Sequence, residues 1–138
     1  MDRGYGKCSL SEPRIADLVQ TSLLFFDCQR YRLLEWVIMP NQVHAILELL
    51  GEWRLKQVLY SWKSFTAKQA LRILDYPPPF WQPESFDRFV RDEQHFQNAI
   101  EYVRNNPVHA GLSGTPQDWV YSSAHVRALA VEREQPVQ

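Results

Sequence analysis

The sequence predicts an α+β fold in which helices cover one face of an antiparallel sheet. Two neighbouring segments, 31–39 and 42–50, are rich in aromatic and branched side chains, and Pro40-Asn41 between them is typical of a tight turn. Three other segments repeat their apolar residues at helical spacing. A central hairpin with helices before and after it is an α+β order, unlike the regular alternation of a parallel sheet.

The first helix is predicted over residues 12–28. Pro13 is tolerated there because the amide that proline lacks would have no partner in the first turn of a helix. The apolar side chains that follow share one helical face. They are Ile15, Leu18, Val19, Leu23 and Phe26. The hairpin of 31–39 and 42–50 comes next in the chain.

A second helix is predicted over residues 53–74, and the run of three prolines that starts at Pro77 ends it. The aromatic stretch 80–90 that follows predicts one more strand. Both interpretations depend on local patterns alone.

Asp92 has the side chain of a helix N-cap, and a third helix is predicted to start there and to end at Pro107 and Gly111. Residues 1–125 are predicted to form one domain, followed by a polar C-terminal tail over 126–138. The chain of 138 residues is long enough for one hydrophobic core and too short for two.

The composition excludes several classes of protein. Hydrophobic residues make up 45% of the chain and charged residues 22%, as in folded domains and unlike disordered chains. The apolar runs fall far short of the roughly 20 residues that cross a bilayer, and the first ten residues resemble no signal peptide. Cys8 and Cys28 are too few for a disulfide framework. We therefore expect a cytoplasmic protein without a membrane partner.

The net charge of −1 hides an uneven distribution. Segment 53–74 contains five basic residues and no acidic one, so the rest of the chain carries −6. On a helix these basic residues flank the apolar face, with Trp62 and Phe65 among them. They are Arg54, Lys56, Lys63, Lys68 and Arg72. Cations beside aromatic rings suit phosphates and unstacked bases, although a solvated helix face with core aromatics is the more ordinary interpretation.

Two elements carry residues with chemical potential. Strand alternation places Gln42 and His44 on one face of the second predicted strand, and Ala45 with its alternate neighbours on the core face. On the third predicted helix, Tyr102 and Asn106 are one turn apart and share a flank beside the apolar stripe. Each has an ordinary explanation when taken alone: a solvent-facing histidine and a packing tyrosine.

Six motifs occur in order between about Gly4 and Ala124. They are Trp36-Val-Ile-Met-Pro-Asn-Gln-Val-His44, Ser61-Trp-Lys-Ser-Phe-Thr-Ala-Lys68, Phe80-Trp-Gln82, Phe86-Asp-Arg88 with Arg91-Asp-Glu93, Tyr102-Val-Arg-Asn-Asn-Pro107 with Ala110-Gly-Leu112, and Asp118-Trp-Val-Tyr-Ser-Ser-Ala124. Together they resemble the REP-associated tyrosine transposases, which belong with the single-tyrosine insertion-sequence transposases in the HUH endonuclease group.

This resemblance implies a protein of DNA transposition and recombination that cleaves and rejoins single-stranded or hairpin DNA, built on a ferredoxin-like sheet. Tyr102 matches the nucleophile that forms a 5′-phosphotyrosine link and frees a 3′-hydroxyl. Gln42, His44 and Asn106 match the ligands of Mg²⁺ or Mn²⁺. The basic residues of 53–74 are the expected DNA contacts. The superfamily contains both monomers and homodimers, and no residue here decides between them.

The chain departs from the family pattern in two places. Gln42 stands where the family has histidine, and its neutral amide is predicted to bind a metal more weakly. The alternative function is therefore a catalytically impaired nucleic-acid-binding regulator or remnant. Relatives also have a strand before the segment that matches residues 4–10. We expect that central strand to be missing, either because the chain is a truncated or mis-started copy or because a partner chain replaces it.

Overall fold

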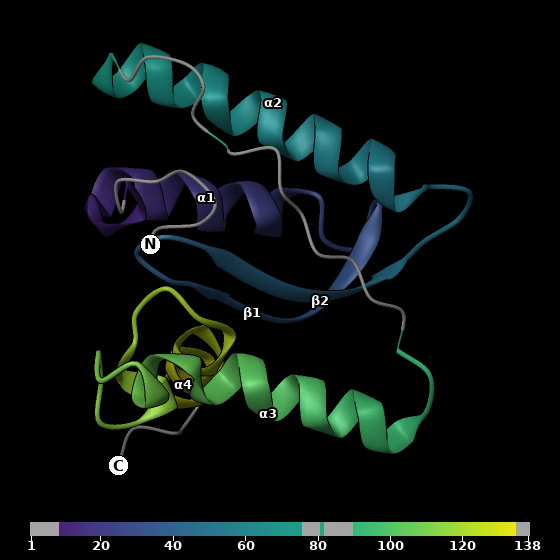
Figure 1. The fold of residues 1–138 in the computed structure, drawn as a ribbon, viewed down its shortest axis with the longest axis vertical. Coiled ribbons are helices and arrows are strands. Elements are labelled where there is room, and N and C mark those ends of the chain that lie inside the picture. Colours follow the sequence, from purple (N-terminus) through teal and green to yellow (C-terminus); the bar gives the residue numbers. More distant parts are fainter. Residues whose placement is uncertain (1–8, 76–80, 82–89, 135–138) are drawn as a thin grey trace.

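Figure 1 shows the computed structural model, which describes residues 9–75, 81 and 90–134 and has an α+β fold. The predicted α+β class is confirmed. Two short 3₁₀ turns, Ser9–Ser11 and Pro116–Asp118, accompany the main elements. The main elements are helix α1 (Pro13–Phe25), strands β1 (Tyr31–Ile38) and β2 (Val43–Leu49), and helices α2 (Leu55–Leu74), α3 (Glu93–His109) and α4 (Ser123–Glu134). No helix within these residues is long and apolar enough to cross a bilayer.

Strands β1 and β2 form the predicted antiparallel hairpin, with a β-bulge in β1. The register shifts between Leu33 and Glu35, so Leu34 is the extra residue. This shift explains why Leu33 and Trp36 lie in the same apolar cluster. Strict alternation would place them on opposite faces of the sheet. The bulge thus turns the side chain of Glu35 away from that cluster.

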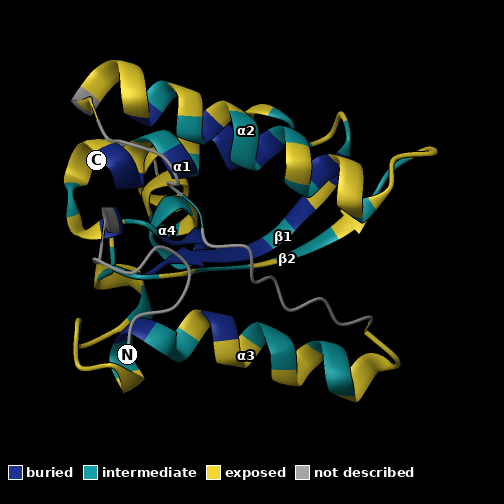
Figure 2. Cartoon of the chain, turned by 45° about the horizontal axis from the view of Figure 1, so that its top comes forward, coloured by how far each residue is buried: buried dark blue, intermediate teal, exposed yellow. Residues whose placement is uncertain are grey.

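The structure differs from the predicted one-sided cover, because helices pack on both faces of the hairpin. Helices α1 and α2 lie on one side and α3 on the other (Figure 1). Trp36 and Ile38 of β1 join the main core with α1 and α2. Val37 joins Met39 and Val103 of α3 in a second cluster. Because β1 is apolar on both faces, each face needs a helix to cover it; Figure 2 shows β1 buried along most of its length.

The outer edge of β1 is covered by the chain that leads into α4. The backbone N–H of Ile38 donates to the carbonyl of Tyr121 at 2.9 Å. The indole N–H of Trp119 donates to the carbonyl of Ile38, also at 2.9 Å. The hydroxyl of Ser123 accepts from the backbone N–H of Trp36 at 3.1 Å. These bonds satisfy the edge of the strand and place the start of α4 beside it.

The predicted polar tail over 126–138 is corrected by the structure, because residues 126–134 continue α4. Val126 packs against the main core, and Arg127 pairs with Glu35. The sequence of 126–134 is mostly polar because only one narrow face of α4 packs against the rest of the protein. The segment therefore shows little apolar periodicity.

Helix α3 ends at His109, between the two residues predicted to end it, Pro107 and Gly111, so Pro107 lies inside the helix. Pro107 and Val103, one turn apart, are both buried, and this packing outweighs the one backbone hydrogen bond that proline removes. Gly111, with φ of +74°, then provides the left-handed residue that ends the helix.

Two predictions fall mostly or wholly outside the described residues. The strand predicted over 80–90 is described only at Trp81 and Val90. The expectation of a missing first strand concerns the chain before residue 9. Trp81 itself is in contact with α2: its ring lies 4.9 Å from that of Trp62, centroid to centroid.

Candidate functional site

The structure brings His44 of β2 and Tyr102 of α3 into direct contact. Their ring centroids are 5.5 Å apart, and the rings meet edge to face at 88°. Two residues that are distant in the sequence therefore form one site between a strand and a helix.

The packing of Val103 explains why these two rings meet. Val103 is buried against Val37 of β1 and Ile46 of β2, and it anchors α3 to the hairpin. His44 is two residues before Ile46 and pairs with Val37, so it shares their face of the sheet. Tyr102 precedes Val103 by one helical step and lies on the flank of α3 that faces His44.

The imidazole of His44 has an unusual environment. Its Nε2 atom is buried and has no hydrogen-bond partner within the part of the chain that the structure describes. Burial also holds the pKa of His44 below the ordinary value of 6.5, so the ring is neutral near pH 7. Buried polar atoms usually have partners, and a neutral imidazole is the form that binds metal ions. This nitrogen therefore fits a ligand role.

Tyr102 is accessible although one side of its ring contacts His44. Its side chain is 60% exposed, whereas Val103 beside it is 4% exposed. A large ligand can therefore approach Tyr102 without a change of fold.

The two amide residues of the predicted site lie on α3 and next to β2, the elements that carry the two rings. Asn106 is half-buried on α3, one turn after Tyr102. Gln42 is exposed just before β2, where its backbone carbonyl accepts from Met39 N–H at 2.8 Å and closes the hairpin turn. Over the described ranges, no three His, Cys, Asp or Glu side chains come together as a metal cluster. A metal here would depend on His44 with amide ligands.

The predicted DNA-binding residues lie on the other side of the sheet from this site. They belong to α2 or to its N-cap, whereas Tyr102 belongs to α3 (Figure 1). Four of them are exposed and one is half-buried. The exposed ones are Arg54, Lys56, Lys68 and Arg72, and the half-buried one is Lys63. The structure thus does not bring the basic helix and the His44–Tyr102 pair together.

Of Trp62 and Phe65, the two aromatic residues predicted to lie among the basic side chains of α2, Phe65 is the one available to a ligand. Phe65 is 46% exposed. Trp62 is 6% exposed and packs against Trp81 in the main core. For Trp62 the ordinary interpretation, a core residue, is therefore right. Ala45 was predicted on the core face and is instead exposed.

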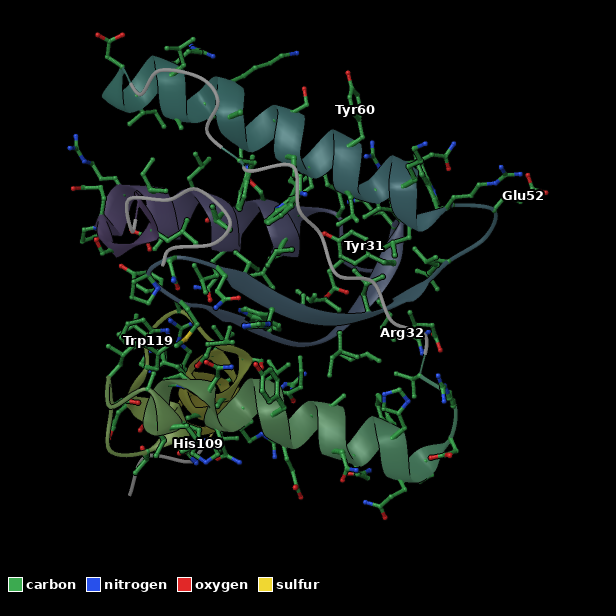
Figure 3. All side chains as sticks on the ribbon, viewed as in Figure 1. Tyr31, Arg32, Glu52, Tyr60, His109 and Trp119 are labelled. Atoms are coloured by element: carbon green, nitrogen blue, oxygen red, sulfur yellow. The ribbon has the colours of Figure 1, made fainter. Side chains whose placement is uncertain are left out.

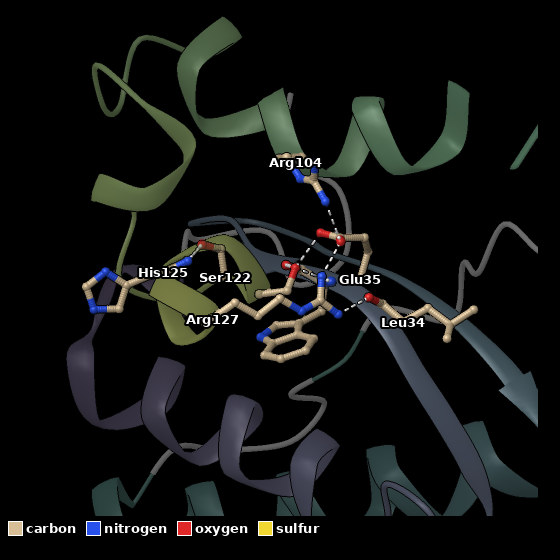
Figure 4. A network of polar contacts seen from close by, with 8 residues as sticks. Leu34, Glu35, Arg104, Ser122, His125 and Arg127 are labelled. Carbon is tan, nitrogen blue, oxygen red and sulfur yellow. Dashed lines mark hydrogen bonds and ion pairs between the residues drawn. The ribbon is translucent and has the colours of Figure 1, made fainter. Parts of the chain in front are cut away.

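A polar network that was not predicted from the sequence lies on the same face of the hairpin as His44. Glu35 is 2% exposed, and its carboxylate accepts a hydrogen bond from the hydroxyl of Ser123. It also pairs with Arg104 of α3 at 2.9 Å and with Arg127 of α4 (Figure 4). The available signal was a single carboxylate between the apolar residues Leu34 and Trp36, which requires a partner when the strand is buried.

Known proteins resemble this chain in sequence and in fold, although no family model matches it. The REP-associated tyrosine transposase of Escherichia coli K12 is 26% identical over 97 residues, which cover 65% of this chain and 52% of that protein. A Haemophilus influenzae protein whose name assigns it provisionally to the same family is 36% identical over 45 residues, or 33% of this chain and 26% of its own. The chain thus spans about half the length of the E. coli protein that it matches.

A solved structure extends this similarity to nearly the whole chain. A REP-associated tyrosine transposase bound to a REP hairpin superposes with a TM-score of 0.76 and 18% identity. The superposition covers 99% of this chain and 84% of the other. At this identity the similarity shows a shared fold.

Proposed function

Because this chain belongs to the REP-associated tyrosine transposase family in sequence and in fold, we propose that it binds hairpin DNA and cleaves and rejoins a single strand through Tyr102. The observation that carries the proposal is the ring contact between Tyr102 and His44. The family resemblance assigns these two positions to the nucleophile and to a metal ligand. Their contact supports a common role.

Two observations support DNA as the ligand. The related solved protein is bound to a REP hairpin, and its fold matches nearly all of this chain. Helix α2 also exposes Lys56, Lys68 and Arg72. Lysine and arginine side chains bind phosphates and release counterions, so this binding is proposed to weaken as salt rises. Because α2 lies across the sheet from Tyr102, the DNA would contact both sides of the protein.

The proposed chemistry is a transesterification at one phosphate. The phenolic oxygen of Tyr102 attacks phosphorus, and the bond from phosphorus to the 3′ oxygen breaks. The phenolic proton leaves to solvent, and the released 3′ oxygen takes up a proton to become a hydroxyl. The new tyrosine ester keeps the energy of the phosphodiester, so the reverse attack by a 3′-hydroxyl rejoins DNA without ATP.

The residues that match the metal ligands of the family suit a divalent cation. His44 offers a buried nitrogen that has no hydrogen-bond partner among the described residues, and Asn106 and Gln42 offer amide oxygens. Bound there, Mg²⁺ or Mn²⁺ would polarise the phosphate and offset the charge that develops in the transition state. One imidazole with two neutral amides predicts weaker binding than a site with two histidines.

The test is covalent capture of a single-stranded DNA hairpin in the presence of Mn²⁺. A 3′-labelled hairpin should become linked to the protein, while a 5′ label should leave on a shorter strand with a free 3′-hydroxyl. Tyr102→Phe should form no adduct. Tyr60→Phe is the matched control, because Tyr60 is 76% exposed on α2 and points away from the protein (Figure 3).

The outcomes separate the two candidate functions. Absence of an adduct with any divalent metal, also in Gln42→His, would contradict the catalytic proposal. Salt-sensitive hairpin binding under the same conditions would then favour a nucleic-acid-binding regulator. A gain of adduct in Gln42→His over the natural chain would identify residue 42 as the limit on activity.

A further inference from the structure

We propose that Glu35 and Arg104 are positioning residues that set the rotation of α3 and thereby hold Tyr102 against His44. The ion pair lies outside the proposed reaction site and supports it from the opposite flank of the helix. The catalytic consequence rests on the proposed function, whereas the structural consequence does not.

The positions along α3 place Arg104 and Tyr102 on opposite flanks. They are two positions apart, with Val103 between them, which corresponds to about 200° around a helix. Tyr102 reaches His44 of β2, and Arg104 reaches the carboxylate of Glu35 on β1 at 2.9 Å. The helix is therefore held on one flank by each strand of the hairpin.

The apolar contact between these flanks does not by itself set the rotation of α3 about its own axis. Val103 is 4% exposed and packs with Val37 and Ile46. Such contacts are non-directional and tolerate a rotation that keeps the side chain buried. A hydrogen bond between charged groups is directional, and the 2% exposure of Glu35 leaves its carboxylate little freedom to follow a moving partner.

Arg127 provides a matched control within the same network. It pairs with the same carboxylate oxygen as Arg104, and the two arginine side chains are similarly exposed, at 48% and 45%. Arg127 comes from α4, however, and donates to the carbonyl of Leu34 (Figure 4). Loss of the Arg127 side chain removes one cation from Glu35 but leaves α3 bound to Glu35 through Arg104.

The experiment measures the ring contact and the reaction separately in Arg104→Leu and Arg127→Leu. The ring contact is read by NMR as nuclear Overhauser effects between the His44 and Tyr102 ring protons, in protein without metal or DNA. We expect Arg104→Leu to lose these effects and to form the adduct about 100-fold more slowly, as for a nucleophile displaced by about 1 Å. Arg127→Leu should keep both the effects and most of the rate.

A conservative variant covers the case in which Arg104→Leu does not fold. Arg104→Lys keeps a cation near Glu35 and should retain a weakened ring contact and part of the rate. Equal losses in the Arg104 and Arg127 variants, or an intact ring contact in Arg104→Leu, would overturn the positioning role. If the unmodified protein forms no adduct, the proposed function fails, and the ring contact still decides this proposal.

Discussion

Glu35 and His44 lie on neighbouring strands and hold the same helix from its two flanks. Glu35 on β1 binds Arg104, and His44 on β2 contacts the ring of Tyr102. Val37, two residues after Glu35, is the direct strand partner of His44. The hairpin thus supplies both the carboxylate that binds α3 and the histidine that is the candidate metal ligand beside Tyr102.

His44 should make the protein less stable as the solution becomes acidic. Its pKa in the folded protein is below 6.5 because the ring is buried, so the unfolded chain takes up a proton that the folded protein resists. The free energy of unfolding should therefore fall as pH drops below about 6.5. Urea titrations between pH 7.5 and 5 measure this slope.

Two variants assign that slope to His44. His44→Gln should flatten it, whereas His109→Gln, at an exposed position of α3, should leave it unchanged. A slope that survives in His44→Gln would assign the effect to other groups.

Tyr31 should make the protein less stable as the solution becomes strongly alkaline. Burial raises its pKa to about 12 from an ordinary 10.0, so the folded protein keeps the phenol proton after the unfolded chain has lost it. The free energy of unfolding should fall as pH rises from 10 towards 12. Comparing Tyr31→Phe with the natural chain over this range isolates the contribution, because the variant has no phenol to titrate.

The same substitution should cost stability at neutral pH. The hydroxyl of Tyr31 donates to the backbone carbonyl of Leu23 at 2.5 Å, in the last turn of α1, where carbonyls lack helical partners. Tyr31→Phe should lower the free energy of unfolding by about 1 kcal/mol at pH 7, measured by urea denaturation. An unchanged value would mean that water replaces the lost donor.

Hairpin binding should depend on salt through the exposed cations of α2. Lys56→Gln and Lys68→Gln should each weaken binding and lower the salt slope by about 1 if the side chain contacts a phosphate. Fluorescence anisotropy with a labelled hairpin at several salt concentrations measures both. Arg133→Gln, an exposed position in the last turn of α4, is the control and should bind normally.

Manganese should stabilise the folded protein through His44. Binding to the folded state alone adds about 2.7 kcal/mol to the free energy of unfolding when the free metal is at 100 times its Kd. Thermal melts with rising Mn²⁺ should therefore shift upward, and Gln42→His should shift at lower concentrations. The same shift in His44→Gln would place the metal elsewhere.

Local signals in the sequence predicted most of the elements correctly. The second helix was predicted over 53–74 and is Leu55–Leu74, because its apolar residues repeat at the helical period. The hairpin was predicted from its Pro40-Asn41 turn and its two apolar runs, and it forms. These features depend on neighbours in the chain, which a sequence shows directly.

The β-bulge, the burial of Glu35 and the docking of α4 could not be predicted in this way. Nothing beside Leu34 in the sequence indicates an extra residue in the strand. The bulge keeps Leu33 and Trp36 in one core and points Glu35 to the face that α3 and α4 cover with arginines. Each of these features depends on residues that are distant in the chain.

The sequence by itself determined the chemical groups of the candidate site and the local placement of some of them. Helical periodicity placed Tyr102 and Asn106 on one flank of a helix. The resemblance to a known family identified His44 and Gln42 as matches to its metal ligands. Only the tertiary structure decided that Tyr102 meets His44 and that the basic residues of α2 lie across the sheet from both. The reason is that this geometry depends on the packing of Val103 of α3 against the strands and on the ion pair between Arg104 and Glu35, and both are contacts between residues that are distant in the chain.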